Sequence, residues 1–116
     1  MIALERGSRH IAIVLNATRE YGFEVQIPTS ALAQVWRGGP RSAVLARLVD
    51  ASKMDPLDER RAKQVGSRLG ARDRTDLVDC HVVCCALERR AMVATSDVDD
   101  LGALTEPHES LALIAV

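Results

Sequence analysis

The sequence predicts an α/β fold with a mainly parallel sheet. Short apolar runs typical of strands alternate along the chain with longer amphipathic patterns typical of helices. Only 3% of the residues are aromatic although 47% are hydrophobic, so the core must be built from aliphatic side chains. The length of 116 residues suits a single domain over residues 1–116.

The first half of the chain is expected to alternate between helices and short strands. Gly22 ends the first helical pattern, and the alternating residues after it suit a strand. Thr29 or Ser30 can cap the next helix, because a hydroxyl oxygen accepts from the free backbone N–H groups there. The run GGP at 38–40 breaks the helical pattern before it resumes. The expected helices cover residues 8–21, 31–37 and 41–50, and the expected strands cover residues 23–28 and 52–56, the second of them weak.

The second half continues this alternation. An amphipathic helical pattern ends at Gly70, with Val65 on its apolar side and Arg61 on its charged side. Thr75 can cap the next helix, which is apolar on nearly every side and should therefore be buried. The expected helices cover residues 58–69, 76–90 and 97–104, and the expected strands cover residues 91–95 and 110–116.

Three cysteines lie close together on the buried helix. Their odd number and tight spacing do not fit a disulfide framework, and we interpret them as small apolar core residues. His81 and Cys85, four residues apart, share a helix face, but the chain offers no second pair of ligands that would complete a zinc site. The cysteines are Cys80, Cys84 and Cys85.

Charge and hydropathy predict a cytoplasmic protein that does not enter the membrane. The net charge is −1, which does not by itself attract polyanions. The apolar runs are far shorter than the roughly 18 residues that a membrane span needs. Glu5 and Arg6 stand where a signal peptide would be apolar.

Acidic residues follow the strand expected over 91–95. Asp97, Asp99 and Asp100 lie within four residues. They suit the first turn of a helix, where negative charge is favoured and where Ser96 and Asp99 have the spacing of a capping box. They equally suit a divalent cation, because ligands of parallel sheets bind beyond the carboxyl ends of strands.

A second acidic group opens the buried helix over 76–90. Asp76 and Asp79, three residues apart, share a helix face. The helix dipole alone can account for Asp76, whereas Asp79 has apolar neighbours and needs an arginine or a cation as its partner. The connection over 89–92 can bring the two acidic groups together. Because clustered carboxylates are ligands of Mg²⁺ and Mn²⁺, the pair predicts a metal site.

Two acidic motifs resemble a known family. The runs DLVDCHVVCCAL and MVATSDVDDL resemble the carboxyl-terminal half of PIN-domain proteins, in particular VapC-type toxins of toxin–antitoxin pairs. The runs IALERGSRH and LAQVWRGGPR resemble an actinobacterial branch of that group. The resemblance implies a three-layer α/β/α sandwich with a five-stranded parallel sheet. It also implies cleavage of single-stranded RNA with Mg²⁺ or Mn²⁺, neutralisation by a VapB-like antitoxin, and a homodimer.

The resemblance also implies roles for individual residues. Asp79 and Asp97 match the catalytic acids that hold the metal, with Asp100 and Asp76 as auxiliary ligands. Such hydrolysis uses metal-activated water, so a Ser–His or Cys–His pairing, of which we see none, is not required. Thr95 and Ser96 are the hydroxyls expected to position phosphate. Separately from the resemblance, Arg37 and Arg41 flank a loop, where they either contact RNA backbone or are solvated.

The sequence departs from the family pattern at two places. Gln34 stands where the family usually has an acid, and an amide oxygen can ligate but brings no charge. The first, central strand with its Asp is missing from the start of the chain, which predicts exposed strand edges and a chain shortened at its amino terminus. An alternative is therefore a catalytically impaired PIN-like protein that acts only through antitoxin binding or self-association. A third interpretation is an unrelated α/β binding domain whose acids only cap helices.

Overall fold

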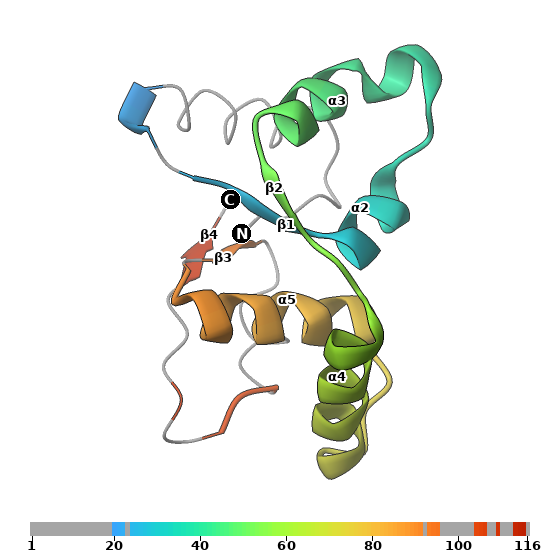
Figure 1. Ribbon diagram of the computed structural model, residues 1–116, viewed down its shortest axis with the longest axis vertical. Coiled ribbons are helices and arrows are strands. Elements are labelled where there is room, and N and C mark those ends of the chain that lie inside the picture. The colour runs from blue at the N-terminus through green and yellow to red at the C-terminus, as the bar shows by residue number, and fades with distance from the viewer. Residues whose placement is uncertain are drawn as a thin grey trace.

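The computed structural model describes residues 20–22, 24–91, 93–95, 104–106, 109 and 113–115 (Figure 1). This part of the chain is mixed α/β, as predicted. The strands are β1 (Gln26–Pro28), β2 (Lys53–Asp55), β3 (Val93–Thr95) and β4 (Leu113–Ala115). The helices are α2 (Thr29–Val35), η1 (Gly39–Ser42), α3 (Ala43–Asp50), α4 (Glu59–Ala71) and α5 (Leu77–Arg89).

The strands form two separate parallel pairs among the described residues, β1 with β2 and β3 with β4. Parallel pairing confirms the sheet type expected from the alternation of strands and helices. The continuous five-stranded sheet that the family resemblance implies is not present in this part of the chain. In the first pair, Pro28 is in register with Asp55, so the carboxyl ends of both strands lie at one edge.

Helix α5 lies at the centre of the described structure and contacts α4, α2 and β1 (Figure 1). Its residues 80–86 are all buried, which confirms the prediction made from its apolar surface. All three cysteines of this helix are buried and free, in agreement with their interpretation as core residues. Around α5 pack the fully buried side chains Ile27, Leu48, Val65 and Leu104.

Helix α2 begins without the predicted hydroxyl cap. Pro28 is its N-cap residue and no side chain caps the helix. Both candidate hydroxyls make tertiary contacts instead: Thr29 Oγ1 accepts from the backbone N of Leu57 at 3.0 Å, and Ser30 Oγ lies 2.6 Å from His81 Nδ1. The capping prediction was wrong because both residues already lie inside the first helical turn, where their side chains reach neighbouring elements.

Helices α4 and α5 also differ from prediction at one end each. Asp58 caps α4 by accepting from the backbone N of Arg61 at 2.8 Å, but the helix continues through Gly70, and the positive φ of 52° falls on Asp73. Thr75 does not cap α5, whose N-cap residue is Asp76 and which has no side-chain cap. Of the helix expected over 97–104, only Leu104 is described, and it is in a turn. Of the helix expected over 8–21, only residues 20–21 are described, and both are helical.

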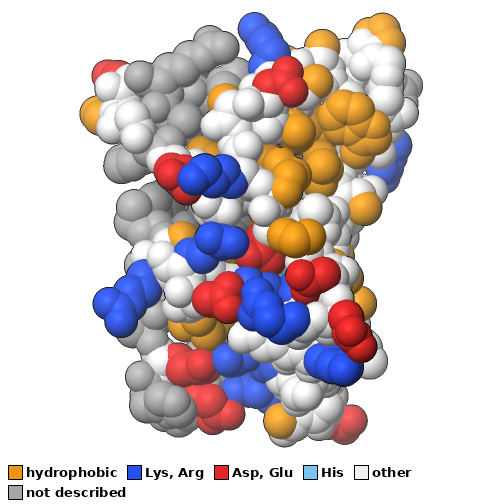
Figure 2. All heavy atoms as spheres, viewed as in Figure 1, with side chains coloured by type: hydrophobic (Ala, Val, Ile, Leu, Met, Phe, Trp, Pro, Cys, Tyr) orange, Lys and Arg blue, Asp and Glu red, His pale blue; other side chains and the backbone are white. Residues whose placement is uncertain are grey.

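The helices in the described ranges are too short or too polar to cross a lipid bilayer. One face of the molecule carries hydrophobic side chains gathered at the end where α2 and α3 lie (Figure 2). Towards the end where α4 lies, acidic and basic side chains are interleaved on the same face (Figure 2). That face therefore presents both signs of charge rather than a single basic patch.

Candidate functional site

The predicted metal-site residues are only partly within the described structure. Asp79 lies in the first turn of α5, is half-buried and has an interaction partner. Thr95 is the last residue of β3. Asp97, Asp100 and Ser96 lie outside the described residues, so the meeting of Asp79 with Asp97 stays a prediction.

Asp76 is held by an arginine. Its two carboxylate oxygens accept from Nε and Nη2 of Arg74, each at 3.2 Å. The hydrogen bond with Arg74 lowers the pKa of Asp76, so the group is ionised at neutral pH. A carboxylate with both oxygens on a guanidinium is poorly placed to ligate a cation as well. Asp76 is therefore the weakest member of the predicted ligand set.

Gln34 and Arg37 lie together at the end of α2. Gln34 is exposed, and its backbone oxygen accepts from Arg37 Nη2 at 2.9 Å. Arg37 Nη1 also donates to the backbone oxygen of Trp36 at 2.8 Å. Arg37 thus satisfies carbonyl groups that the helix end leaves free, which favours a structural role over RNA contact. The side chain of Arg41 lies outside what the structure describes.

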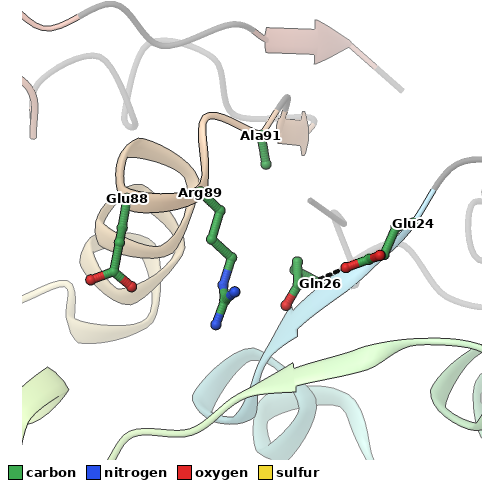
Figure 3. Close-up of a pocket in the computed structure, with 5 residues that line it drawn as sticks. All are labelled: Glu24, Gln26, Glu88, Arg89 and Ala91. Atoms are coloured by element: carbon green, nitrogen blue, oxygen red, sulfur yellow. Dashed lines mark hydrogen bonds between the residues drawn. The ribbon is translucent and has the colours of Figure 1, made fainter.

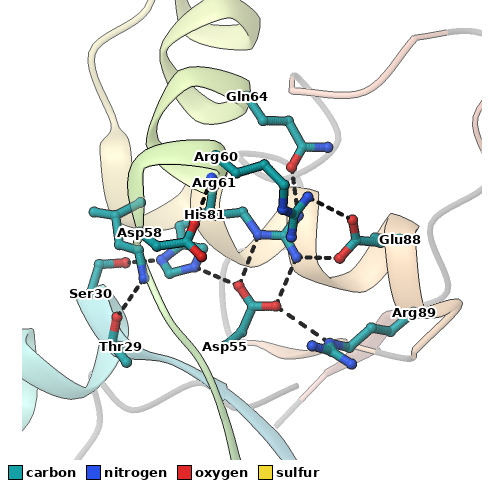
Figure 4. A network of polar contacts seen from close by, with 11 residues as sticks. Thr29, Ser30, Asp55, Asp58, Arg60, Arg61, Gln64, His81, Glu88 and Arg89 are labelled. Carbon is teal, nitrogen blue, oxygen red and sulfur yellow. Dashed lines mark hydrogen bonds and ion pairs between the residues drawn. The ribbon is translucent and has the colours of Figure 1, made fainter.

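A buried polar network at the carboxyl end of β2 was not predicted (Figure 4). Its centre is Asp55, 1% exposed. Asp55 Oδ1 accepts from Arg61 Nε at 2.9 Å and lies 2.9 Å from His81 Nε2. Asp55 Oδ2 accepts from Arg61 Nη2 at 2.8 Å and lies 3.4 Å from Arg89 Nε. Groups from β2, α4 and α5 thereby converge on one carboxylate.

Arg61 connects this carboxylate to a second acid. The Arg61 side chain is 1% exposed and also donates to Glu88 on α5 and to Gln64. Burial alone would lower the pKa of Arg61, but hydrogen bonds to Asp55 and Glu88 raise it. Likewise, burial would raise the pKa of Asp55, but hydrogen bonds from Arg61 and His81 lower it. Both groups are therefore charged, and each balances the other inside the fold.

His81 completes the network as a neutral side chain. Burial lowers its pKa despite the opposing contact with Asp55. An ionised carboxylate can only accept, so Nε2 carries the ring proton and Nδ1 accepts from the Ser30 hydroxyl. The order Ser30–His81–Asp55 is that of a nucleophile, a base and an orienting acid. This pairing corrects the expectation that the chain contains no Ser–His contact.

The Ser30–His81 pair is nevertheless poorly suited to nucleophilic catalysis. His81 is fully buried, and the charge of Asp55 is already balanced by Arg61 and by the nearby Arg89. Asp55 therefore has little charge left with which to stabilise an imidazolium, which a base in that position must become. We interpret the contact as part of the structural network that joins α2, β2 and α5.

A second set of arginines fixes the segment around residues 104–109 to α4. Arg68 donates from Nη1 and Nη2 to the two carboxylate oxygens of Glu109 at 2.7 and 2.8 Å, and Nη1 also donates to the backbone oxygen of Leu104 at 2.9 Å. Arg72 Nη2 donates to Glu106 at 2.6 Å. In sequence this segment follows the acidic stretch after β3 and precedes strand β4, so α4 anchors the chain between them.

The buried network around Asp55 was not predicted because Arg61 was assigned to the charged face of its helix. In the structure, Arg61 shares the buried face with Val65, four residues later. The spacing of four is a signal that could have been used, since an arginine on an apolar stripe needs a buried acid. Asp55, at the end of a short strand, was the available candidate.

No protein-family model, no curated protein and no solved structure matches this chain. Within the described ranges, no group of three or more His, Cys, Asp or Glu side chains could hold a metal ion. The resemblance to PIN domains therefore continues to depend on the two sequence motifs.

Proposed function

We propose that this chain is a divalent-metal-dependent endoribonuclease of the VapC type, the toxin of a toxin–antitoxin pair. The observation that carries the proposal is the reversal of the chain between α5 and β3. Helix α5 ends at Arg89, the left-handed conformation of the next residue, Arg90 (φ 53°), turns the backbone, and β3 then lies beside the carboxyl-terminal half of α5 (Figure 1). A strand that starts at the carboxyl end of a helix and reverses direction points back towards the start of that helix, where Asp79 lies. This arrangement supports convergence of Asp79 with the acids after Thr95.

The residues fit a hard cation to different degrees. Asp79 and Asp97 are the proposed ligands, with Asp100 as an auxiliary one. Asp76 contributes only if Arg74 releases it, and Asp55 contributes nothing because its two oxygens are already engaged. Bound there, Mg²⁺ or Mn²⁺ would activate water and offset the charge of the attacked phosphate. Thr95 and Ser96 would position that phosphate.

The proposal includes protein partners. A VapB-like antitoxin and a second copy of the chain would cover hydrophobic surface in the cytoplasm. Two exposed aromatic side chains, Tyr21 before β1 at 66% and Trp36 at the end of α2 at 42% exposure, support such contacts. The hydrophobic side chains gathered at the α2–α3 end of the visible face support them as well (Figure 2).

Cleavage of a fluorescent single-stranded RNA tests the proposal. We expect cleavage with Mn²⁺ or Mg²⁺ and none with EDTA. Asp79→Asn and Asp97→Asn should each reduce the rate at least about 100-fold, because each removes charge from the ligand set. Glu59→Gln is the matched control, since Glu59 is an exposed acid on α4 that pairs with Lys63 at 3.1 Å. Cleavage that survives EDTA, or that the two Asp variants retain, would refute the proposal.

Gln34 favours one second candidate. Its neutral amide occupies the position of the family's helix acid and is exposed on α2. The alternative function is therefore binding of an antitoxin, or self-association, without catalysis. Gln34→Glu distinguishes the two candidates. If the chain is an impaired nuclease, the added carboxylate should create or strongly increase Mn²⁺-dependent cleavage, whereas an active nuclease should already cleave before the substitution.

A further inference from the structure

A groove lies between the start of β1 and the end of α5 (Figure 3). Its volume is about 540 Å³, and it is open to solvent. The described residues that line it are Glu24, Gln26, Glu88, Arg89 and Ala91. The groove is at the amino-terminal end of β1, whereas the acids proposed to bind metal follow the carboxyl end of β3.

Gln26 presents an unpaired acceptor in this groove. Its side chain is 7% exposed, and Nε2 donates to Glu24 Oε1 at 2.8 Å. Because a carboxylate can only accept, the amide nitrogen must face Glu24 and the amide oxygen must point away from it. That buried oxygen has no hydrogen-bond partner among the described residues. A buried carbonyl without a donor costs free energy, which a bound donor would recover.

Arg89 faces Gln26 from the opposite wall. Figure 3 shows the two side chains extending towards each other from α5 and β1. The only contact of the Arg89 guanidinium within the described ranges is the 3.4 Å approach of Nε to Asp55 Oδ2, and 41% of the side chain is exposed. Arg89 can therefore rotate to uncover the Gln26 oxygen, and its terminal nitrogens can bind an anionic group in two-pronged fashion.

The lining groups stand in an order that suits a ligand with opposite charges at its two ends. Arg89 supplies N–H donors, and Gln26 and then Glu24 supply acceptors (Figure 3). Glu24 Oε1 is engaged by Gln26 and by Lys53 Nζ at 3.4 Å, which leaves Oε2 as an acceptor. Glu88 carries no unpaired charge, because Arg60 and Arg61 hold it.

We propose that the groove binds the zwitterionic end of a free α-amino acid. The ligand carboxylate pairs with Arg89, and its ammonium group donates to Gln26 Oε1 and to Glu24. The volume of about 540 Å³ leaves space for the ligand side chain. This function is separate from ribonuclease activity and does not depend on the metal ligands.

Other ligand classes fit less well. A nucleobase usually stacks on an aromatic ring, and no aromatic side chain is among the described lining residues. A phosphate dianion would be repelled by the Glu24 carboxylate that lines the groove. A simple carboxylate or a simple amine would use only half of the groups that the groove offers.

Thermal unfolding of the intact chain with single L-α-amino acids at 10 mM tests the proposal. A ligand present at ten times its Kd should raise the unfolding midpoint by about 5 °C in a domain of this size. Acetate, methylamine, inorganic phosphate and uridine monophosphate at the same concentration should each give less than about 1 °C. Titration calorimetry then gives the affinity of the best amino acid.

Three variants and a control locate the site. Gln26→Leu removes the unpaired oxygen without leaving a new buried polar group, and Arg89→Gln removes the carboxylate partner. Arg89→Lys keeps a positive charge beside Asp55 but loses the two-pronged contact. Each should weaken binding at least about 10-fold, a change that a single lost charged contact produces. Lys63→Ala, on exposed α4 surface, should bind normally.

Either of two results would overturn the proposal. The first is a midpoint that no amino acid raises, or that acetate, methylamine, phosphate or uridine monophosphate raises equally. The second is binding that Gln26→Leu and both Arg89 variants retain. Because the readout is ligand binding in the absence of RNA and of added metal, its failure leaves the ribonuclease proposal untouched, and the reverse also holds.

Discussion

The Asp55–Arg61 pair offers the strongest test of what holds this fold together. We consider Asp55→Asn, which keeps the size and shape of the side chain and removes its charge. Arg61 would then be a buried cation with its main partner neutralised, since its side chain is 1% exposed. The amide nitrogen of the substituted side chain would also face a donor, either Arg61 or His81, where a carboxylate oxygen accepts now.

The expected loss follows from this geometry. Breaking a buried ion pair by removing one partner typically costs about 3–5 kcal/mol. For 116 residues, an unfolding entropy of about 2.1 cal/mol/K per residue converts this loss into a midpoint lowered by about 12–20 °C. Glu88→Gln should cost about 1 kcal/mol, because Glu88 is 39% exposed and solvent screens its contacts. Glu59→Gln, which breaks an exposed pair within α4, should cost less than about 0.5 kcal/mol.

Urea unfolding followed by far-ultraviolet circular dichroism measures all three variants. An unchanged slope of the unfolding free energy against urea concentration would show that the variants lose stability without a change in the compactness of the folded or unfolded state. Restoring an apolar site in Asp55→Leu with Arg61→Met should recover part of the loss, because no buried charge then remains on these two residues. The reasoning fails if Asp55→Asn costs less than about 1 kcal/mol, or if the three single variants cost the same.

Four further predictions concern pH dependence, helix capping and the reactivity of the cysteines. His81 faces Asp55 and Arg61, and burial lowers its pKa below the ordinary 6.5. As the pH falls, the His81 imidazole is therefore protonated in the unfolded chain before it is protonated in the folded one. The free energy of unfolding should fall as the pH drops below about 6.5, and it should fall less in His81→Gln. A further loss should come near pH 4 and below, since hydrogen bonds keep the pKa of Asp55 and Glu88 low in the folded state. Asp58→Ala, which removes the cap on the backbone N of Arg61, should cost about 1 kcal/mol in the same urea assay, and an unchanged midpoint would contradict the capping role. Cys80 and Arg68 lower the pKa of the Cys84 thiol to about 7, but Cys84 is only 1% exposed, and the other two cysteines are buried as well. A thiol reagent at pH 8 should therefore label none of the three cysteines in the folded chain and all of them in urea.

The elements that could be predicted from sequence are those with a strong local pattern. Helix α5 was predicted to be buried because Val82, Val83, Cys84 and their neighbours leave it no polar side, and the structure confirms this burial. The strand over 23–28 was predicted from the alternation of apolar and polar residues before Pro28, and the strand after Ser52 only weakly. Helix ends were less predictable, because the residues that could cap them had other partners. Ser30 is bound to His81, which lies 51 positions away, and no local pattern reveals such a contact.

The candidate metal site could be proposed from the sequence, whereas the groove could be recognised only in the structure. Asp79 and Asp97 could be proposed from sequence because each lies at the start or end of an element whose type was clear. The groove could not, because Gln26 and Arg89 are ordinary polar residues in sequence. Their significance depends on the amide nitrogen of Gln26 facing Glu24, which leaves its oxygen unpaired, and on the single long contact of Arg89 with Asp55. Those are properties of packing between β1, β2 and α5.

The hydrogen-bonding pattern of the fold identifies two acids, Asp55 and Asp76, that arginines already hold. Asp55 receives donors from Arg61 and lies in contact with His81 and Arg89, while Asp76 has both oxygens on Arg74. A cation at either position would have to displace a guanidinium, which costs the charge-assisted hydrogen bonds it makes. Asp55 and Asp76 are therefore poorly suited to bind metal. Substituting Arg74 should strengthen Mn²⁺ binding if Asp76 is an auxiliary ligand, because it frees both oxygens of Asp76. If calorimetry of Arg74→Gln shows unchanged Mn²⁺ affinity, Asp76 is a helix-terminal structural residue and the ligand set lies entirely on Asp79 and the acids after Thr95.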